Sequence, residues 1–363
     1  MAKLGEVCLL KAGKFVSAND ISPEYNKGLY PCFGGNGIRG YVADYTHDGE
    51  FPLIGRQGAL CGNVNLASGK FHATEHAVVV QPKIEMNVHW LYYALNAMNL
   101  GQYATGAAQP GLAVSKLETL SIEIPNISEQ NKIAQTLYKV EQLVNFRKQQ
   151  LAKLDELVKA RFVEMFGELH KTEYNIKTLD ELCEFIKDGT HQTPTYVDVT
   201  EGYKFLSSKD VTSGYIDWSS IKYISEELHQ ELYKRIAPQR GDILLAKNGT
   251  TGIPAIVETD ETFDIYVSLA LLRLKPSNNV RYIWSALRMP ETKAQFDNSL
   301  KGVGVPNLHL GEIKKTKIIV PPFSLQNQFA AFVEHVDKQK QTVQQSLEKL
   351  ELMKKALMQE YFG

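Results

Sequence analysis

The feature of this sequence that most constrains its fold is an internal duplication. Residues 87–167 and residues 279–363 carry similar motifs in the same order, and Gln130 corresponds to Gln326 at an offset of 196 positions. Motifs nearer the start of each copy also match, at shorter offsets, so the differences in length lie between the motifs. A repeat of about 180 residues is much longer than the unit of a solenoid. The sequence therefore predicts one domain followed by one long helix, present twice.

Each copy ends in a segment with the apolar spacing of a long helix, at 128–167 and at 324–363. Apolar residues recur at alternating intervals of three and four positions, and neither segment contains Gly or Pro before its final glycine. Ser128 is the expected N-cap of the first helix. Charged residues interrupt the apolar seam at four positions: Arg147, Arg161, Lys340 and Lys354.

A helix of this length with an apolar seam is not stable alone in water. Because the two helices are equally long, we expect them to pair as an antiparallel coiled coil. That pairing would place the two domains at opposite ends of the helix pair, related by an approximate twofold axis. The alternative is that each helix packs only on its own domain.

The two domains, residues 1–127 and 168–323, are expected to be similar globular α/β domains, which makes the chain α+β overall. Short runs of β-forming residues alternate with Gly-rich turns in both. Each domain also contains one amphipathic helix, predicted at Val88–Met98 and at Val280–Arg288.

The composition is that of a globular chain and excludes several classes of protein. No apolar run reaches the roughly 18 residues that a membrane span requires. The four cysteines are scattered without a CxxC pair, so neither a zinc site nor a disulfide is expected, and a cytoplasmic location is favoured. The formal net charge is −1. Any binding of nucleic acid must therefore depend on a local patch, or on a partner that contacts the phosphates.

A search for catalytic motifs finds none with the required residues. Val320-Pro-Pro-Phe323 resembles a loop of amino-methyltransferases, but Val320 cannot accept a hydrogen bond from a target amino group. No phosphate-binding or cofactor-binding glycine loop accompanies it. His72 and His76 flank Glu75 without the spacing of a zinc-binding HExxH motif, so we interpret them as ordinary histidines.

Glycine-rich loops occur at corresponding places in both copies. Residues 54–58 and 245–252 each follow a predicted strand and place backbone N–H groups beside a cation and an amide. Arg and Lys suit guanine, and Asn and Gln suit adenine. For any single loop, a hairpin turn with solvated charges is the simpler explanation. The recurrence of such loops in both copies favours a role in binding.

Together these motifs resemble those of the specificity subunit of type I restriction–modification systems. The resemblance covers essentially the whole chain and rests on Tyr30-Pro-Cys-Phe-Gly-Gly-Asn-Gly37, Gly106-Ala-Ala-Gln-Pro-Gly-Leu112, and the two helical segments that follow Ile124-Pro125 and Val320-Pro321. The second copy lacks the Tyr-Pro string and carries Lys187-Asp-Gly-Thr-His-Gln-Thr-Pro194 instead. The two domains are therefore expected to read different DNA sequences.

The resemblance implies two target recognition domains, each reading one half of a bipartite site in the major groove of double-stranded DNA. The helix pair would set the gap between half-sites whose centres lie ~10 bp apart. The implied partners are two modification (methyltransferase) subunits, which carry S-adenosylmethionine and methylate adenine N6, and restriction/translocase subunits. The chain itself would then be non-catalytic, with no cofactor or metal of its own and no contact with a membrane.

Residues in the matched loops are the candidates for DNA binding. The expected base contacts are Asn36, Arg39, Arg56, Gln57 and Gln109 in the first domain, and His191, Gln192, Lys247, Asn248, Thr250 and Asn307 in the second. The expected phosphate contacts are Lys116, Lys209 and Lys301.

Two rival functions come from other classes of protein. A coiled-coil adaptor would dimerise other proteins without sequence-specific DNA binding. A nucleic-acid enzyme with an unrecognised active site would turn over substrate by itself. No paired carboxylates or cofactor loops recur in both copies, which disfavours the enzyme. An adaptor has no need for matched loops that carry amides.

Overall fold

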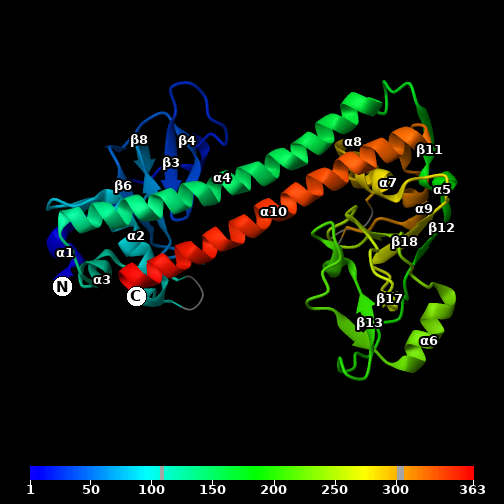
Figure 1. The fold of residues 1–363 in the computed structure, drawn as a ribbon. Helices are drawn as coiled ribbons and strands as arrows, with labels where there is room; N and C mark the ends of the chain where they lie inside the picture. Colours follow the sequence, from blue (N-terminus) through cyan, green and yellow to red (C-terminus); the bar gives the residue numbers. More distant parts are fainter. Residues whose placement is uncertain (107–109, 301–305) are drawn as a thin grey trace. The chain divides into compact units, whose positions relative to one another are not determined.

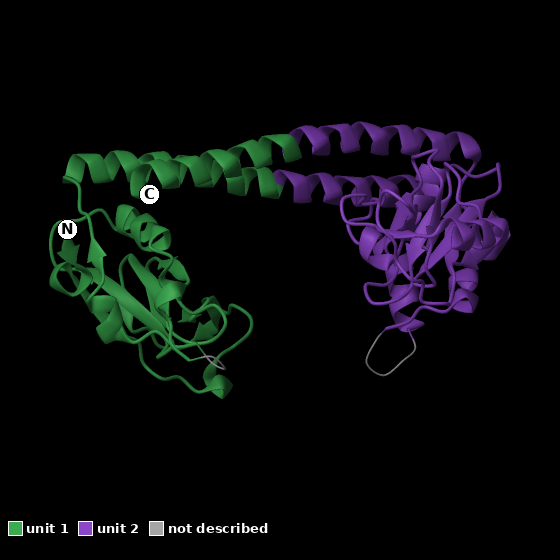
Figure 2. Ribbon diagram, turned by 90° about the horizontal axis from the view of Figure 1, so that it is seen from below, with its two compact units in different colours: residues 1–149, 344–363 green, residues 150–343 purple. Residues whose placement is uncertain are grey.

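The structure is a computed structural model that describes residues 1–106, 110–300 and 306–363. It divides into two compact units, Met1–Gln149 with Gln344–Gly363, and Gln150–Val343 (Figure 2). Gln109 and Lys301, two of the predicted contacts, lie outside the described residues. Each unit contains one domain and parts of both long helices.

Unit 1 contains a four-stranded antiparallel sheet in the order β2-β9-β6-β7, a second sheet in the order β4-β3-β8-β5, and the short pair β1-β10 (Figure 1). Its strands are β1 (Ala2–Lys3), β2 (Cys8–Ala12), β3 (Tyr30–Gly34), β4 (Gly37–Val42), β5 (His47–Asp48), β6 (Phe51–Gly55), β7 (Val64–Ala67), β8 (Lys70–Ala73), β9 (Ala77–Pro82) and β10 (Ser121–Ile122). Its domain helices are α1 (Leu4–Val7), α2 (Val88–Ala97) and α3 (Val114–Glu118).

Unit 2 repeats this topology. Its four-stranded sheet has the order β12-β18-β15-β16, its second sheet the order β14-β13-β17, and its short pair is β11-β19. The strands are β11 (Asn175–Thr178), β12 (Cys183–Asp188), β13 (Tyr203–Leu206), β14 (Lys222–Ile224), β15 (Ile243–Ala246), β16 (Pro254–Ile256), β17 (Phe263–Ile265), β18 (Leu269–Leu274) and β19 (Lys317–Val320). The domain helices are α5 (Leu179–Leu182), α6 (Glu226–Arg235), α7 (Val280–Leu287), α8 (Pro290–Asn298) and α9 (Leu310–Lys315).

The pairing of the strands confirms that the two domains are duplicates. In unit 1, β3 runs parallel to β8 and antiparallel to β4. In unit 2, β13 runs parallel to β17 and antiparallel to β14. The amphipathic helices expected at Val88–Met98 and Val280–Arg288 are α2 and α7, each ending one residue earlier. Helices α6 and α8 were not predicted from the sequence.

A central strand of each four-stranded sheet is buried on both faces, which explains its continuous apolar sequence. In β9, Val78 and Val80 contribute to the hydrophobic cluster that includes α2, and Val79 contributes to the cluster that includes β8. In β18, Leu272 faces the cluster of α7 and Leu271 the opposite cluster. The alternation follows from the two-residue period of a strand.

The long helices are α4 (Ile127–Phe166) and α10 (Phe323–Phe362), each 40 residues long. α4 begins one residue before the expected N-cap, because the Asn126 side chain accepts the Glu129 N–H at 3.0 Å. Ser128 therefore lies inside the helix, and its prediction as the cap was wrong.

The two long helices contact each other in both units. In unit 1, Lys354 of α10 donates to Glu141 of α4 at 2.6 Å. In unit 2, Lys340 donates to Asp155 at 2.7 Å. Later residues of α10 thus meet earlier residues of α4, so the helices are antiparallel in each unit. Lys340 and Lys354, which interrupt the apolar seam, are accommodated by acids on the facing helix.

A buried glutamine joins each domain to the start of its long helix. The Gln130 side chain accepts the Asn87 N–H at 2.9 Å and donates to the Pro125 carbonyl at 2.8 Å. The Gln326 side chain accepts the N–H of Asn279 at 2.9 Å and donates to the carbonyl of Pro321 at 2.9 Å. The best-matched position of the sequence repeat is therefore a structural joint.

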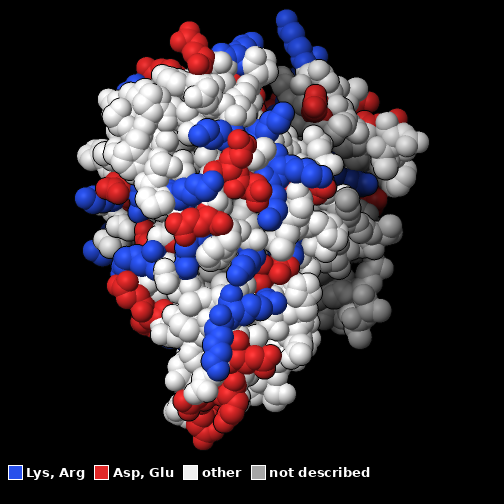
Figure 3. Space-filling view, turned by 90° about the vertical axis from the view of Figure 1, so that its right-hand side faces the viewer, with Lys and Arg blue, Asp and Glu red and all other residues white. Residues whose placement is uncertain are grey.

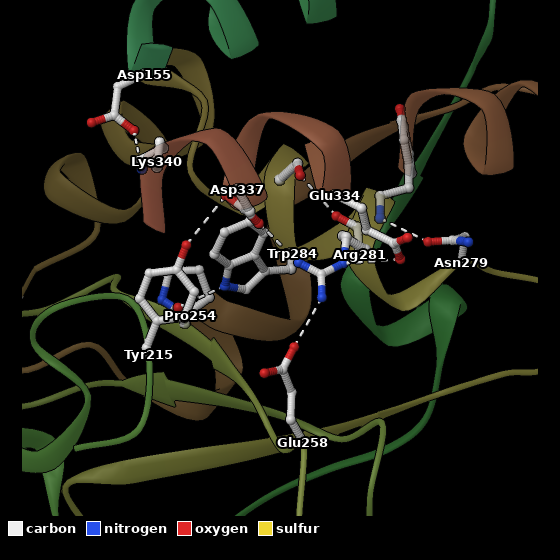
Figure 4. A network of polar contacts seen from close by, with 12 residues as sticks. Asp155, Tyr215, Pro254, Glu258, Asn279, Arg281, Trp284, Glu334, Asp337 and Lys340 are labelled. Carbon is white, nitrogen blue, oxygen red and sulfur yellow. Dashed lines mark hydrogen bonds and ion pairs between the residues drawn. The ribbon is translucent and has the colours of Figure 1, made fainter. Parts of the chain in front are cut away.

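Unit 2 has an additional charged joint, formed by Arg281 of α7 (Figure 4). Its guanidinium lies 3.0 Å from Asp337, 3.5 Å from Glu334 and 2.9 Å from Glu258. The Tyr215 hydroxyl donates to Asp337 at 3.3 Å. Burial raises the pKa of the Asp337 carboxyl, although Arg281 opposes that rise. The contacts fix α7 against α10.

Candidate nucleic-acid interface

In unit 1, the loop between β6 and β7 is held between two other segments at one end of the four-stranded sheet. The Arg56 N–H donates to the His76 carbonyl at 3.0 Å, and the Arg56 carbonyl accepts the Leu112 N–H at 2.9 Å. The Gly58 N–H donates to the Pro110 carbonyl at 3.0 Å. Residues 110–112 of the second glycine-rich segment that the sequence singles out therefore lie beside the first, 54–58.

Unit 2 makes the same main-chain hydrogen bonds around the loop between β15 and β16. The Lys247 N–H donates to the Ser268 carbonyl at 2.9 Å, and the Lys247 carbonyl accepts the Leu308 N–H at 2.8 Å. The Gly249 N–H donates to the Pro306 carbonyl at 3.2 Å. We call this set of bonds the loop frame. It makes Arg56 the structural counterpart of Lys247, and His76 the counterpart of Ser268.

The turn between β3 and β4 joins the loop frame of unit 1. A Cβ at Gly55 would lie 1.9 Å from the Gly35 carbonyl oxygen, so only glycine allows this approach. At the tip of the turn, Asn36 accepts a hydrogen bond from the Asn63 side chain at 2.7 Å. Asn36 thus lies beside the β6–β7 loop, as its assignment to the same binding surface requires.

The predicted contacts of unit 1 differ in exposure. Asn36, Arg39, Gln57 and Lys116 are exposed, and the Lys116 ammonium lies 5.6 Å from the centre of the Tyr103 ring. Arg56 is half-buried, its Nε is buried without a hydrogen-bond partner, and it forms no ion pair with any described residue. The remaining donors of Arg56 are available to a ligand.

The predicted contacts of unit 2 gather around the equivalent loops. Asn248 and Asn307 face each other across an antiparallel bridge, and the side-chain oxygens of both are buried without a hydrogen-bond partner. Gln192, Thr250 and Lys209 are exposed. Exposed amides and hydroxyls of this kind can read base edges.

Two predicted contacts of unit 2 are held by Asp188 at the end of β12. The Lys247 ammonium donates to the Asp188 carboxylate at 2.7 Å, and the Lys247 side chain is only 7% exposed. The exposed His191 imidazole lies 3.3 Å from the same carboxylate. A base contact by Lys247 would require a buried ion pair to open, so the geometry favours a positioning role for this residue.

Helix α6 contributes a residue that the sequence analysis missed. The Arg235 guanidinium, in its last turn, donates to the carbonyls of Asp188 and Gly189 at 2.8 and 2.6 Å. It thereby fixes the start of the segment that carries His191 and Gln192. No local pattern signals this contact, because the partners lie more than forty positions apart in the chain.

A buried carboxylate lies under the same segment. Asp264 of β17 is 2% exposed and lies 2.6 Å from the His229 ring of α6, while Tyr203 stacks on that ring. Burial raises the pKa of Asp264 to about 6, against the opposing effect of His229. The pair packs α6 against the second sheet of unit 2.

Charge is mixed rather than concentrated in one sign. On the face in Figure 3, Lys and Arg lie among Asp and Glu, most densely in the middle of the view. Within the described ranges there is no group of three or more His, Cys, Asp or Glu that could hold a metal ion. None of the helices described has a stretch long and apolar enough to cross a bilayer. The chemistry that both units offer is hydrogen bonding from amides and cations on a fixed loop frame.

Comparison with known proteins identifies this arrangement. The family model of the type I restriction modification DNA specificity domain matches residues 1–156 and again residues 171–352. The chain belongs to this family of specificity subunits. The expectation drawn from the motifs is confirmed.

Individual relatives agree with the family assignment. The EcoprrI specificity subunit of Escherichia coli is 53% identical over 143 residues, which are 39% of this chain and 36% of that protein. The match thus spans little more than a third of that relative. The MjaVIII specificity subunit of Methanocaldococcus jannaschii is 21% identical over 321 residues, 83% of this chain and 75% of the relative. The crystal structure of the type I restriction–modification S subunit from M. genitalium has the same fold, with a TM-score of 0.61 at 18% identity over 99% of this chain and 95% of that one.

Proposed function

We propose that this chain reads a bipartite DNA site for a type I restriction–modification complex, each unit reading one half in the major groove. The observation that carries the proposal is the repeated loop frame with different side chains on it. Arg56 and Gln57 occupy the places of Lys247 and Asn248, so two half-sites of different sequence are expected. Donors of these types discriminate between bases in the major groove.

The antiparallel helices act as the spacer between the two half-sites. Their contacts within each unit, through Glu141–Lys354 and Asp155–Lys340, support a defined register. Half-sites read on one side of the duplex are separated by about one helical turn, ~10 bp centre to centre. The gap would then be a fixed number of unspecified base pairs.

The chemistry is supplied by partners. Two modification subunits that carry S-adenosylmethionine would dock on the duplicated scaffold and methylate adenine N6, and restriction/translocase subunits would complete the enzyme. This chain is assigned no catalytic step and no cofactor. Its near-neutral charge fits a division of labour in which the partners contact phosphates and this chain contacts bases.

The test is sequencing of N6-methyladenine in DNA from cells that co-express this chain with its modification subunit. We expect one bipartite motif with a fixed gap, of which one half changes when residues 1–127 are exchanged for those of another specificity subunit. If both halves changed together, the assignment of one half-site to each unit would be wrong. A soluble complex that leaves no bipartite motif would support the alternative function, a coiled-coil adaptor without sequence-specific DNA binding.

A further inference from the structure

The connection between β8 and β9 carries Glu75 and His76, and the sequence alone marks His76 only as an ordinary histidine. It lies inside the loop frame of unit 1, because the His76 carbonyl accepts the Arg56 N–H at 3.0 Å. It also touches the β3–β4 turn, since a Cβ at Gly35 would lie 3.3 Å from the same carbonyl oxygen. Glu75 and His76 are therefore placed between two loops of the candidate interface.

Among the described residues of the four segments that form this surface, 34–37, 56–63, 74–76 and 105–106 with 110–112, Glu75 is the only acid. Its carboxylate lies 3.2 Å from the His76 ring, and the two side chains are 35% and 39% exposed. The second carboxylate oxygen, Oε2, is buried without a hydrogen-bond partner among the described residues, as is His76 Nδ1. Buried polar atoms are normally satisfied, so the carboxylate of Glu75 has hydrogen-bonding capacity that the described residues do not use.

Unit 2 shows that the loop frame does not need this acid. The counterparts of Glu75 and His76 are Val267 and Ser268, and the Lys247 N–H still donates to the Ser268 carbonyl at 2.9 Å. Because the hydrogen bonds of the loop frame form with valine at this position, a carboxylate there is free to serve a role other than folding. In unit 1 that role is open to the ligand, because no ion pair joins Glu75 to Arg56 among the described residues.

A carboxylate on a DNA-binding surface restricts what it can contact. Phosphates repel it, and base acceptors such as guanine O6 and N7 cannot donate to it. In the major groove, the donors that remain are the exocyclic amino groups of cytosine and adenine.

We propose that Glu75 is a specificity-determining residue of unit 1, which accepts a hydrogen bond from the exocyclic amino group of one base. His76 is a positioning residue that holds the carboxylate toward the groove. The inference rests on the proposed function and adds to it an acidic residue that contacts a base, beside the cationic Arg56.

The experiment uses the full chain in complex with its modification subunit and compares methylation motifs of the unmodified protein with those of Glu75→Gln. We expect one position of the half-site assigned to residues 1–127 to lose its preference, by on the order of tenfold. A cytosine or an adenine at that position identifies which amino group is read. The other half-site stays sharp and serves as an internal control. Glu85→Gln, at an exposed site beyond the far end of β9, is the matched control and should leave the motif unchanged.

The role of His76 is tested on the same readout. His76→Ala should weaken discrimination at the same position as Glu75→Gln, and His76→Gln, which retains a donor for the carboxylate, should restore it. Competition between duplexes that differ at that base pair provides the binding measurement.

Other results would overturn the inference in distinguishable ways. An unchanged motif in Glu75→Gln and also in Glu75→Val, which removes the acceptor altogether, would show that the side chain reads no base. Loss of the entire first half-site would show that Glu75 maintains the fold of unit 1, and equal weakening on all sequences would show a non-specific role. The absence of any bipartite motif with the unmodified protein would overturn the proposed function itself.

Discussion

The two loop frames have the same main-chain hydrogen bonds, but their cationic side chains, Arg56 and Lys247, have different surroundings. In unit 2, Lys247 is tied to Asp188 at 2.7 Å. In unit 1, the counterpart of Asp188 is Ala12, because Gly13 and Gly189 donate their N–H groups to the equivalent carbonyls of Ala77 and Leu269. Arg56 therefore lacks the acid that neutralises Lys247. A single position on a neighbouring strand, Asp188 or Ala12, therefore determines whether the cation of the loop frame is paired within the protein or free to contact a ligand.

A second equivalent position also differs in chemistry. His72 of β8 and Asp264 of β17 occupy the same register, since Thr74 and Tyr266, two residues later in each case, both donate to the neighbouring strand. Both side chains are buried, at 8% and 2% exposure. Unit 1 thus holds an imidazole where unit 2 holds a buried carboxyl group whose pKa is raised.

The strongest test of the common architecture removes the buried glutamine of each unit. Gln130→Ala and Gln326→Ala each leave an N–H and a carbonyl unsatisfied beside a long helix. We expect each substitution to lower the free energy of unfolding of its own unit by about 3 kcal/mol. Labelling of the buried thiols during urea unfolding separates the units, because Cys8 lies in unit 1 and Cys183 in unit 2. A large loss of stability in one unit and none in the other would show that the two glutamines do not have equivalent roles.

The pH dependence of unit 2 should trace to Asp264. The folded-state pKa of about 6 lies above the usual value of 3.8, so the folded state binds the proton more tightly than the unfolded state does. The stabilising contribution is complete below pH ~4 and is lost as the pH rises through about 6, by roughly 3 kcal/mol. In Asp264→Asn this loss should be absent.

The measurement is urea unfolding of both proteins between pH 4.5 and 7, read by pulsed hydrogen exchange in peptides of each unit. Unit 1, which has His72 at the equivalent position, should show the same pH profile in both proteins. An identical pH profile of unit 2 in both proteins would show that Asp264 does not titrate in this range.

Replacing Arg56 and Lys247 with methionine tests whether the two side chains have different roles. Lys247→Met leaves the mostly buried Asp188 carboxylate without its cation and should destabilise unit 2 by about 2 kcal/mol. The double variant with Asp188→Asn should recover most of that loss. Arg56→Met should leave the stability of unit 1 within ~0.5 kcal/mol but relax one base of its half-site by ~1–3 kcal/mol. Thiol labelling and methylation motifs report the two effects, and a relaxed motif in Lys247→Met without loss of stability would reverse the assignment.

The sequence was sufficient to predict the duplication, the long helices and the amphipathic helix of each domain. Periodicity and repeated strings encode these features locally, as in the run from Ile133 to Phe166. Whether an individual charged side chain is paired or free could not be predicted in this way. Whether Lys247 is free depends on Asp188, 59 positions earlier in the chain, and on a strand pairing that no local pattern specifies. For the same reason, the sequence did not place Glu75 and His76 at the interface. Their position follows from the hydrogen bond of the Arg56 N–H to the His76 carbonyl, which joins distant parts of the chain.

The smallest expected effect concerns the lysines in the helix seam, where the two units are most alike. Lys340→Met and Lys354→Met each remove one partly exposed ion pair and add apolar surface to the seam. We expect changes below ~1 kcal/mol in either direction, because desolvation offsets most of the attraction between such charges. Thiol labelling during urea unfolding again provides the measurement for each unit.

The acids on α4 should not be equivalent, although their lysines are. Glu141 also accepts the Tyr93 hydroxyl at 2.9 Å, whereas no such hydroxyl bond to Asp155 is found among the described residues. Glu141→Ala should therefore destabilise unit 1 more than Asp155→Ala destabilises unit 2, by about 1 kcal/mol for the lost hydrogen bond. Tyr93→Phe, which removes the hydroxyl alone, should abolish that difference. Equal losses in the two alanine variants would show that the hydrogen bond from Tyr93 to Glu141 does not stabilise unit 1.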